Sequence, residues 1–226
     1  MTHNHLIFFV VCLALLATFT VVGKEQIIAI DGANGFVGSS LINDMIEENH
    51  LRIGCYNCPT EVFKEYNYYD GNICDQEYLT KFLASVDIYF QMAAIASVEP
   101  KNSLQEYILT NSLAPYIASR VNRSMIMVTM STIAVCDVDQ IAGMELWVEQ
   151  FVRYFTAYES MISTMPQSLL KQKLGNYLVS SPPPYIKGNQ YYGLSKLLLE
   201  KLLSDFFLIR NNSFYLGNKD KKKLNT

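Results

Sequence analysis

Short apolar runs alternate with helix-periodic segments along the first half of the chain. The first run, residues 27–30, is followed by closely spaced glycines and then by apolar residues at helical spacing, which predict a helix ending near Glu48. The later runs predict strands over 51–55, 65–69, 86–94 and 124–130, and the amphipathic segments predict helices over about 76–85 and 104–121. Strands that alternate with helices are typical of right-handed crossovers, so we predict an α/β fold with a doubly wound parallel sheet of the Rossmann type.

The second half of the chain departs from this alternation. Aromatic residues recur at helical spacing between Trp147 and Tyr158, so residues 143–174 are predicted to form one or two helices. We interpret about 139–180 as a helical insertion whose aromatic stripe packs in the core. The remaining predicted features are a helix break at 180–184, a helix over 190–205 and a sixth strand over 206–209.

Length and charge limit the classes of function. The chain has 226 residues, which suits one domain with appendages, and we assign that domain to residues 24–217. A formal net charge of −3 gives no electrostatic reason to expect nucleic acid as a partner. The basic residues within 218–226 are interpreted as a solvated tail.

An uncharged apolar run over residues 6–22 precedes the domain. It is near the short limit for spanning a bilayer and slightly long for the core of a signal peptide. Residues 1–23 are therefore interpreted as a signal peptide or a membrane anchor, which predicts a location in the secretory pathway or membrane association through residues 6–22. The alternative is a hydrophobic extension to a cytoplasmic domain.

Gly32, Gly35 and Gly38 stand between the first predicted strand and helix. In a strand–turn–helix unit the backbone N–H groups and the helix dipole can bind a pyrophosphate without a cationic side chain. We expect Gly32 to serve the turn, Gly35 the close approach of phosphates, and Gly38 the packing of helix on strand. A structural turn without a ligand is the alternative, because a lone glycine triplet is a weak signal.

Cys55 and Cys58 form a CxxC pattern among the five cysteines. This pattern suits a redox pair or half of a zinc site, but the sequence offers no second CxxC or His pair to complete a metal site. We therefore predict no metal and interpret the two as incidental thiols that pair in an oxidising compartment.

Tyr192 and Lys196 are four residues apart on the last predicted helix, so their side chains share one face. A nearby ammonium lowers the pKa of a tyrosine, which then serves as a general base or acid near neutral pH. An ordinary surface pair is the alternative. The order of features favours the chemical interpretation: a glycine turn, a strand ending in Ala93 and Ala94, a strand ending in hydroxyl residues, and this helix.

With these features in this order, the chain resembles the extended short-chain dehydrogenase/reductase family, the NAD-dependent nucleotide-sugar epimerases and dehydratases. The resemblance covers about residues 26–217 and implies an NAD(P)-binding Rossmann domain. It rests on GANGFVG at 32–38, Asn72-Ile73, VDIYFQMAA at 86–94, Asn111 in LTNSLAP, MST at 130–132, YGLSK at 192–196 with Glu200, and the stretch from Ile209.

The resemblance implies that Tyr192 takes a proton from a sugar hydroxyl while hydride passes from that carbon to the nicotinamide. Lys196 holds the ribose hydroxyls, and Thr132, or alternatively Ser131, hydrogen-bonds the reacting oxygen. The implied catalytic residues are Thr132, Tyr192, Lys196 and Asn111. The implied cofactor-binding residues are Gly32, Gly35, Phe36, Val37, Gly38, Asn72, Ile73, Ala93, Ala94 and Lys196. The implied cofactor is NAD, with NADP as the alternative.

The sequence also departs from the family pattern. Asp31 stands where the family has a small or hydroxyl residue, and a carboxylate beside a pyrophosphate is unfavourable unless it points away. Ile133 and Ala134 replace the two acids of the dehydratases. The chain stops at Thr226, where the family continues into a C-terminal substrate domain, so we expect that domain to be largely missing.

Two hypotheses for the function follow. The first is an NAD(P)-dependent nucleotide-sugar epimerase/dehydratase-like protein that acts on a UDP- or dTDP-linked sugar by tyrosine-assisted hydride transfer. The alternative is a truncated, catalytically inactive paralogue that binds NAD(P) or a protein partner. The catalytic residues favour the first hypothesis, and the missing domain favours the second. A homodimer is an open alternative for the assembly.

Overall fold

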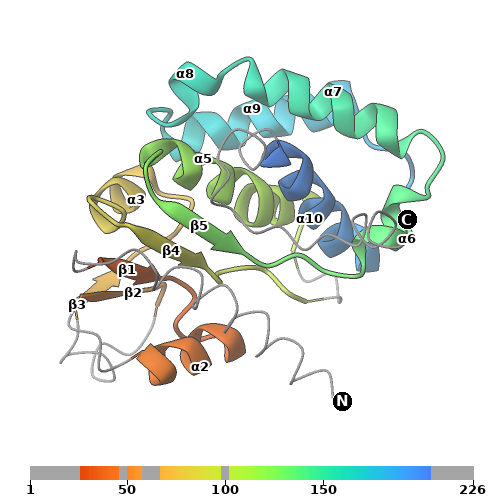
Figure 1. Ribbon diagram of the computed structural model, residues 1–226. Coiled ribbons are helices and arrows are strands. Elements are labelled where there is room, and N and C mark those ends of the chain that lie inside the picture. Colours follow the sequence, from red (N-terminus) through yellow and green to blue (C-terminus); the bar gives the residue numbers. More distant parts are fainter. Residues whose placement is uncertain (1–25, 46–49, 58–66, 98–101, 205–226) are drawn as a thin grey trace, which may run out of the picture.

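A computed structural model describes residues 26–45, 50–57, 67–97 and 102–204 of the chain. These residues contain a five-stranded sheet with the order β3-β2-β1-β4-β5, in which all neighbouring strands are parallel (Figure 1). The strands are β1 (Ile28–Ile30), β2 (Leu51–Cys55), β3 (Asn67–Asp70), β4 (Ile88–Gln91) and β5 (Ile126–Thr129). The predicted α/β fold with a doubly wound parallel sheet is confirmed.

The strand order reverses at the centre of the sheet. From β1 the chain moves outward to β2 and β3, and then returns to place β4 on the other side of β1. Ile30 lies opposite both Ile53 and Phe90, so β1 ends level with its two neighbours. Ligands of open α/β sheets bind at the carboxyl ends of the strands at such a reversal.

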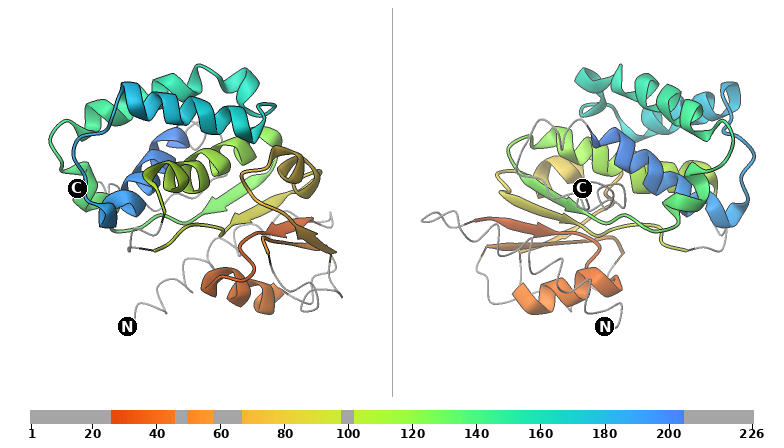
Figure 2. Two further views of the ribbon diagram at one scale, coloured as in Figure 1. Left: turned by 180° about the vertical axis from the view of Figure 1, so that it is seen from behind. Right: turned by 45° about the vertical axis from the view of Figure 1, so that its right-hand side comes forward.

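Helices cover both faces of the sheet. Helix α2 (Phe36–Met45) lies on one face, and the other face carries α3 (Gln76–Phe82), α5 (Ala114–Val121) and α10 (Tyr191–Leu202) (Figures 1 and 2). Successive side chains of a strand point to opposite faces, so Ile28 and Ile30 pack in the core cluster on the α2 side. Ala29, between them, packs in the larger cluster on the other side.

The helix predicted over 104–121 is present but changes its geometry in the middle. It consists of α4 (Leu104–Ile108), the π-helical segment η2 (Leu109–Leu113) and α5. Pro115 near the start of α5 has no N–H to donate to the carbonyl of Asn111, four residues before it. The chain is π-helical at this place, and such segments are frequent at functional sites.

The predicted insertion forms a further layer over α5 and α10, on the side away from the sheet (Figure 1). It contains α7 (Met144–Thr156), α8 (Glu159–Ile162) and α9 (Gln167–Ser180), where one or two helices were predicted; Pro166 separates the last two. Trp147, Phe151 and Phe155 of the aromatic stripe are buried, and Tyr154 and Tyr158 pack against the same core cluster, which confirms the place of the stripe in the core.

The insertion also explains why α10 is buried around its whole circumference. α10 contacts α7 on its outer side, and every residue from Gly193 to Leu199 is buried. The short helices α6 (Val135–Asp139) and η3 (Gly188–Gln190) lead into and out of this layer. Helix α10, which carries Lys196, therefore lies between the sheet and the insertion (Figure 1).

Several predictions fall outside the residues that the structure describes. These are the apolar run over 6–22, Cys58, the strand over 206–209 and the basic tail over 218–226. Within the described part of the chain, no helix is both long enough and apolar enough to cross a bilayer.

Candidate dinucleotide-binding site

The glycine turn connects β1 to α2 with backbone atoms in close contact. Gly32 has a φ of +64°, and a Cβ at this position would lie 2.6 Å from the backbone nitrogen of Ala93. A Cβ on Gly38 would lie 2.3 Å from the carbonyl oxygen of Gly32. Gly35 is exposed, and its N–H donates to the Gly32 carbonyl oxygen at 2.8 Å. Side chains at 32 and 38 are thus sterically excluded.

Helix α2 points its N-terminus at the carboxyl end of β1. The first N–H groups of a helix have no acceptor within the helix, and they carry the positive end of its dipole. The first turn of α2 contains no acidic residue, and Phe36 at its start is 82% exposed. The turn and the helix end therefore fit an anionic group such as a pyrophosphate.

Asp31 directs its carboxylate toward β4. It is 1% exposed, and its Oδ1 accepts the N–H groups of Met92 at 2.5 Å and Ala93 at 2.7 Å. Oδ2 accepts the hydroxyl of Tyr89. Burial raises the pKa of Asp31 to about 6. These three donors occupy both carboxylate oxygens of Asp31. The N–H groups at the start of α2 are therefore not hydrogen-bonded by this carboxylate.

The segment that follows β4 is held by side chains. The amide of Gln91 donates to the carbonyl oxygen of Ala93 and accepts the hydroxyl of Thr129 at 2.8 Å, which joins the ends of β4 and β5. Sequence reasoning gave Gln91 no role beyond its place in the motif at 86–94. Ala94 is exposed and Ala93 half-buried, so this strand end carries only small side chains next to the glycine turn.

Lys196 is 2% exposed on α10, and no hydrogen bond joins its ammonium to another described residue. Burial lowers its pKa to about 8, and the carboxylate of Asp31 opposes this shift. Tyr192, one turn earlier, is half-buried, and burial raises its pKa. The structure thus differs from the expectation that Lys196 lowers the pKa of Tyr192, because desolvation is what shifts the tyrosine.

Asn111 and two serines form a buried network around α10. Asn111 Nδ2 donates to the hydroxyl of Ser195 at 3.0 Å, and the Ser112 hydroxyl donates to the Ser195 carbonyl at 2.6 Å. Ser195 in turn donates to the Tyr192 carbonyl at 2.8 Å. Asn111 therefore reaches the residue beside Lys196 rather than the ammonium itself. Sequence reasoning did not single out Ser112 or Ser195, although polar residues inside buried helices are a usable signal.

Ser131 and Thr132 follow β5, and their hydroxyls have different partners. Ser131 donates to the carboxylate of Glu200 on α10. Thr132 Oγ1 accepts the N–H of Ala134 at 3.3 Å. A Cβ on Gly193 would lie 2.5 Å from the Ala134 carbonyl oxygen, so the first turn of α10 packs directly on the turn after Thr132. The segments that carry Thr132 and Tyr192 meet at this contact.

Asn72 and Ile73 lie between β3 and α3. Asn72 Oδ1 accepts the N–H of Cys74 at 2.9 Å, which forms a local turn. Ile73 is 7% exposed and belongs to the core cluster, so its side chain packs inside the protein. Asp75 caps α3 by accepting the N–H groups of Glu77 and Tyr78.

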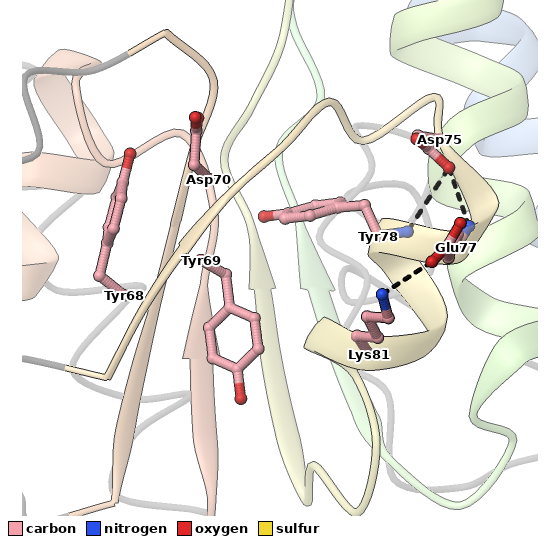
Figure 3. Close-up of a pocket in the computed structure, with 7 residues that line it drawn as sticks. All are labelled: Tyr68, Tyr69, Asp70, Asp75, Glu77, Tyr78 and Lys81. Atoms are coloured by element: carbon pink, nitrogen blue, oxygen red, sulfur yellow. Dashed lines mark hydrogen bonds and ion pairs between the residues drawn. The ribbon is translucent and has the colours of Figure 1, made fainter.

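A cavity of about 480 Å³ opens beside this segment, between β3 and α3 (Figure 3). Its walls are Tyr68, Tyr69, Asp70, Asp75, Glu77, Tyr78 and Lys81. Glu77 pairs with Lys81 at 2.7 Å, and Figure 3 shows Asp75 turned to the helix it caps. No predicted site residue lines the cavity, and we assign it no ligand. Among the described residues, no group of three or more His, Cys, Asp and Glu is placed to hold a metal ion.

Residues 28–126 match the sequence model of the NAD dependent epimerase/dehydratase family. The matched segment runs from β1 to the start of β5 and includes the glycine turn, the end of β4 and Asn111. The match covers less than half of the chain, and this part of the chain is similar to that family. The resemblance that the sequence indicated is therefore confirmed. Among curated proteins, none matches the chain.

Solved structures share the fold at low sequence identity. WbmG of Bordetella bronchiseptica, in complex with NAD and UDP, has a TM-score of 0.51 and 17% identity over 82% of this chain and 52% of its own. The UDP-N-acetylglucosamine 4-epimerase of Methanobrevibacter ruminantium M1, in complex with UDP-N-acetylmuramic acid, has a TM-score of 0.50 and 19% identity over 82% of this chain and 52% of its own. A monomeric L-threonine 3-dehydrogenase from a metagenome has a TM-score of 0.52 and 15% identity over 81% of this chain and 50% of its own. These identities show the fold alone, and the chain spans about half the length of these structures.

Proposed function

We propose that the chain binds NAD at the glycine turn. The observation that carries this proposal is the position of the turn: glycines without room for side chains and an α2 N-terminus without acidic residues stand at the reversal of the strand order. Lys196 adds a buried ammonium without a hydrogen-bond partner among the described residues. The residues that would hold the cofactor are Gly32, Gly35, Phe36, Val37, Gly38, Asn72, Ala93, Ala94 and Lys196.

NADP is the alternative cofactor. In this fold the residues just after β2 meet the adenosine ribose, where an acid favours NAD and a base favours NADP. Tyr56 and Asn57 stand at this position, are exposed, and provide neither charge. The NAD dependence of the family supports the choice of NAD.

We further propose the reaction of a nucleotide-sugar epimerase or dehydratase. When bound, NAD supplies the ring that accepts a hydride from a sugar carbon and returns it. Tyr192 takes the proton of the hydroxyl on that carbon and gives it back in the reverse direction. Thr132 donates a hydrogen bond to the same oxygen. Lys196 donates to the ribose hydroxyls and fixes the orientation of the cofactor.

The proposed substrate is a UDP- or dTDP-linked sugar. Support comes from two solved structures of the same fold, one in complex with NAD and UDP and the other with UDP-N-acetylmuramic acid. The match of residues 28–126 to the epimerase/dehydratase family adds to this support.

Binding without turnover is the second candidate. The observation that favours it is the Tyr192 phenol, whose pKa is raised by burial and is not lowered by Lys196. A phenol with a raised pKa loses its proton less readily near neutral pH, so less of the phenolate base that the proposed reaction requires is present. In this candidate the chain binds NAD(P), or a protein partner, and leaves the sugar unchanged.

Isothermal titration calorimetry with NAD tests the binding step. We expect saturable binding by the wild-type chain and loss of binding in Gly35→Val, whose side chain would occupy the approach to the turn. A matched control is Gly175→Ala on α9, away from the turn, which retains binding. If the folded wild-type chain does not bind NAD at millimolar concentration, both candidates lose their cofactor.

A panel of UDP- and dTDP-sugars separates turnover from binding alone. We expect product formation, or reduction of the cofactor followed by its absorbance, with at least one sugar. Tyr192→Phe should retain NAD binding and lose turnover. Equal activity in Tyr192→Phe and the wild type would overturn the proposed proton transfer, and NAD binding without any turnover supports the second candidate.

A further inference from the structure

The carboxylate of Asp31 joins two strand ends that meet at the dinucleotide site. Asp31 follows β1, and both backbone N–H groups on its Oδ1, those of Met92 and Ala93, follow β4. These N–H groups lie beyond the last paired residue of β4, so the carboxylate replaces the neighbouring strand as their acceptor. Hydrogen bonds to an ionised acceptor are shorter and stronger than those between neutral groups.

The segment from Met92 to Ile95 is held from two sides. Asp31 binds its first two N–H groups, and the side chain of Asn111 binds both the N–H and the carbonyl oxygen of Ile95. A Cβ on Gly32 would touch the same segment at Ala93. The position of this segment relative to the glycine turn therefore depends on Asp31.

The charge of Asp31 acts on Lys196. The titratable groups that act on this carboxylate come from the elements packed against it: Tyr89 of β4, Tyr78 of α3 and Lys196 of α10. Among the described residues, Lys196 is the cation whose charge acts on the Asp31 carboxylate. Both side chains are almost fully buried, so water screens their interaction weakly.

We propose that Asp31 is a positioning residue of the dinucleotide site, which fixes the Met92–Ile95 segment beside the glycine turn and provides a buried negative charge that acts on the ammonium of Lys196. This inference rests on the proposed binding of NAD. Asp31 thereby has two separable roles, one as a hydrogen-bond acceptor and one as a charge.

Two substitutions separate these roles. Asp31→Asn keeps an oxygen that accepts the N–H groups of Met92 and Ala93, and its amide can donate to the Tyr89 hydroxyl, but it has no charge. Asp31→Ala removes the acceptor and the charge together. Asp87→Asn is the matched control, because Asp87 accepts the N–H of Ile27 at 3.0 Å at the opposite end of the β1–β4 pair.

Calorimetric titration with NAD tests the positioning role. At pH 6.5 or below, where Lys196 is charged, we expect Asp31→Ala to bind NAD about tenfold more weakly than Asp31→Asn, since only asparagine retains the acceptor. Asp87→Asn should bind like the wild type. Equal affinities of Asp31→Ala and Asp31→Asn would overturn the positioning role.

Carbon-13 NMR of lysine-labelled protein tests the charge role without cofactor. The Lys196 signal is assigned from its absence in Lys196→Met. We expect its titration midpoint to move to lower pH in Asp31→Asn and to stay unchanged in Asp87→Asn, because only the first substitution removes the neighbouring charge. An unchanged midpoint in Asp31→Asn would overturn the charge role.

The NMR titration also distinguishes failure of this inference from failure of the proposed function. If the wild-type chain does not bind NAD, Asp31 is not a positioning residue for the dinucleotide, and the proposed function fails with it. A lowered Lys196 midpoint in Asp31→Asn still supports the charge role in that case. Wild-type NAD binding with unchanged behaviour of both Asp31 variants overturns the inference alone.

Discussion

Asn111 and Ile95 are joined by two hydrogen bonds that run in opposite directions. The N–H of Ile95 donates to Asn111 Oδ1 at 2.8 Å, and Asn111 Nδ2 donates to the Ile95 carbonyl oxygen at 3.0 Å. The side-chain amide thus pairs with the backbone as a neighbouring strand would. Since Nδ2 also reaches Ser195, one buried side chain connects the end of β4 with the helix that carries Tyr192 and Lys196.

Replacement of Asn111 by leucine should destabilise the fold. Leucine has a similar size but no polar atoms, so the backbone groups of Ile95 and the hydroxyl of Ser195 lose a partner. We expect the free energy of unfolding to fall by about 2–3 kcal/mol in urea denaturation. Asn176→Leu, at an exposed position on α9, is the control and should change it by no more than about 0.5 kcal/mol. Equal effects of the two substitutions would contradict the role of the amide.

Replacement of Gly38 by alanine should disturb the glycine turn. The new Cβ would lie 2.3 Å from the Gly32 carbonyl oxygen, so helix α2 or the turn must move. We expect a loss of about 1–3 kcal/mol in stability, measured by urea denaturation, and weaker NAD binding by calorimetry.

Gly175→Ala is the matched control for this substitution. Its Cβ would meet the end of the flexible Gln105 side chain at 3.2 Å, and alanine favours the helix, so stability should stay constant or rise by up to about 1 kcal/mol. A Gly38→Ala protein as stable as the wild type would show that the turn has room for a side chain.

The stability of the protein should depend on pH through Asp31. Burial raises its pKa from 3.8 to about 6 in the folded state, so the folded protein retains this proton at pH values where the unfolded chain has lost it. Wild-type stability therefore falls relative to Asp31→Asn as the pH rises through about 4 to 6. The difference between the two proteins should grow by about 2.4 kcal/mol from pH 4 to pH 7 in urea denaturation. Parallel pH profiles of the two proteins would contradict the raised pKa.

Local patterns in the sequence determined most of the fold. Apolar runs predicted β2 at 51–55 as observed. The other strands of the sheet and the helices between them follow one another in the predicted order. Hydrophobic periodicity depends only on residues a few positions apart, so it can be recognised in the sequence without the tertiary structure. The break before Pro182, the positive φ of Gly32 and the close contact of Gly38 with the Gly32 carbonyl are local effects of the same kind.

The tertiary structure decided what the site residues contact. The sequence marked Asp31 as unusual, but only the meeting of β1 with β4 shows its carboxylate on Met92 and Ala93, about 60 residues away. Likewise, the spacing of Tyr192 and Lys196 predicted a shared helix face, whereas the packing of α10 against α6, η2 and α7 determines their burial. Hydrogen-bond partners and pKa shifts arise from non-local contacts and desolvation, which a one-dimensional pattern does not contain. The sequence alone thus determined the order of the elements and the glycine turn, and only the folded chain decided how charge is distributed around that turn.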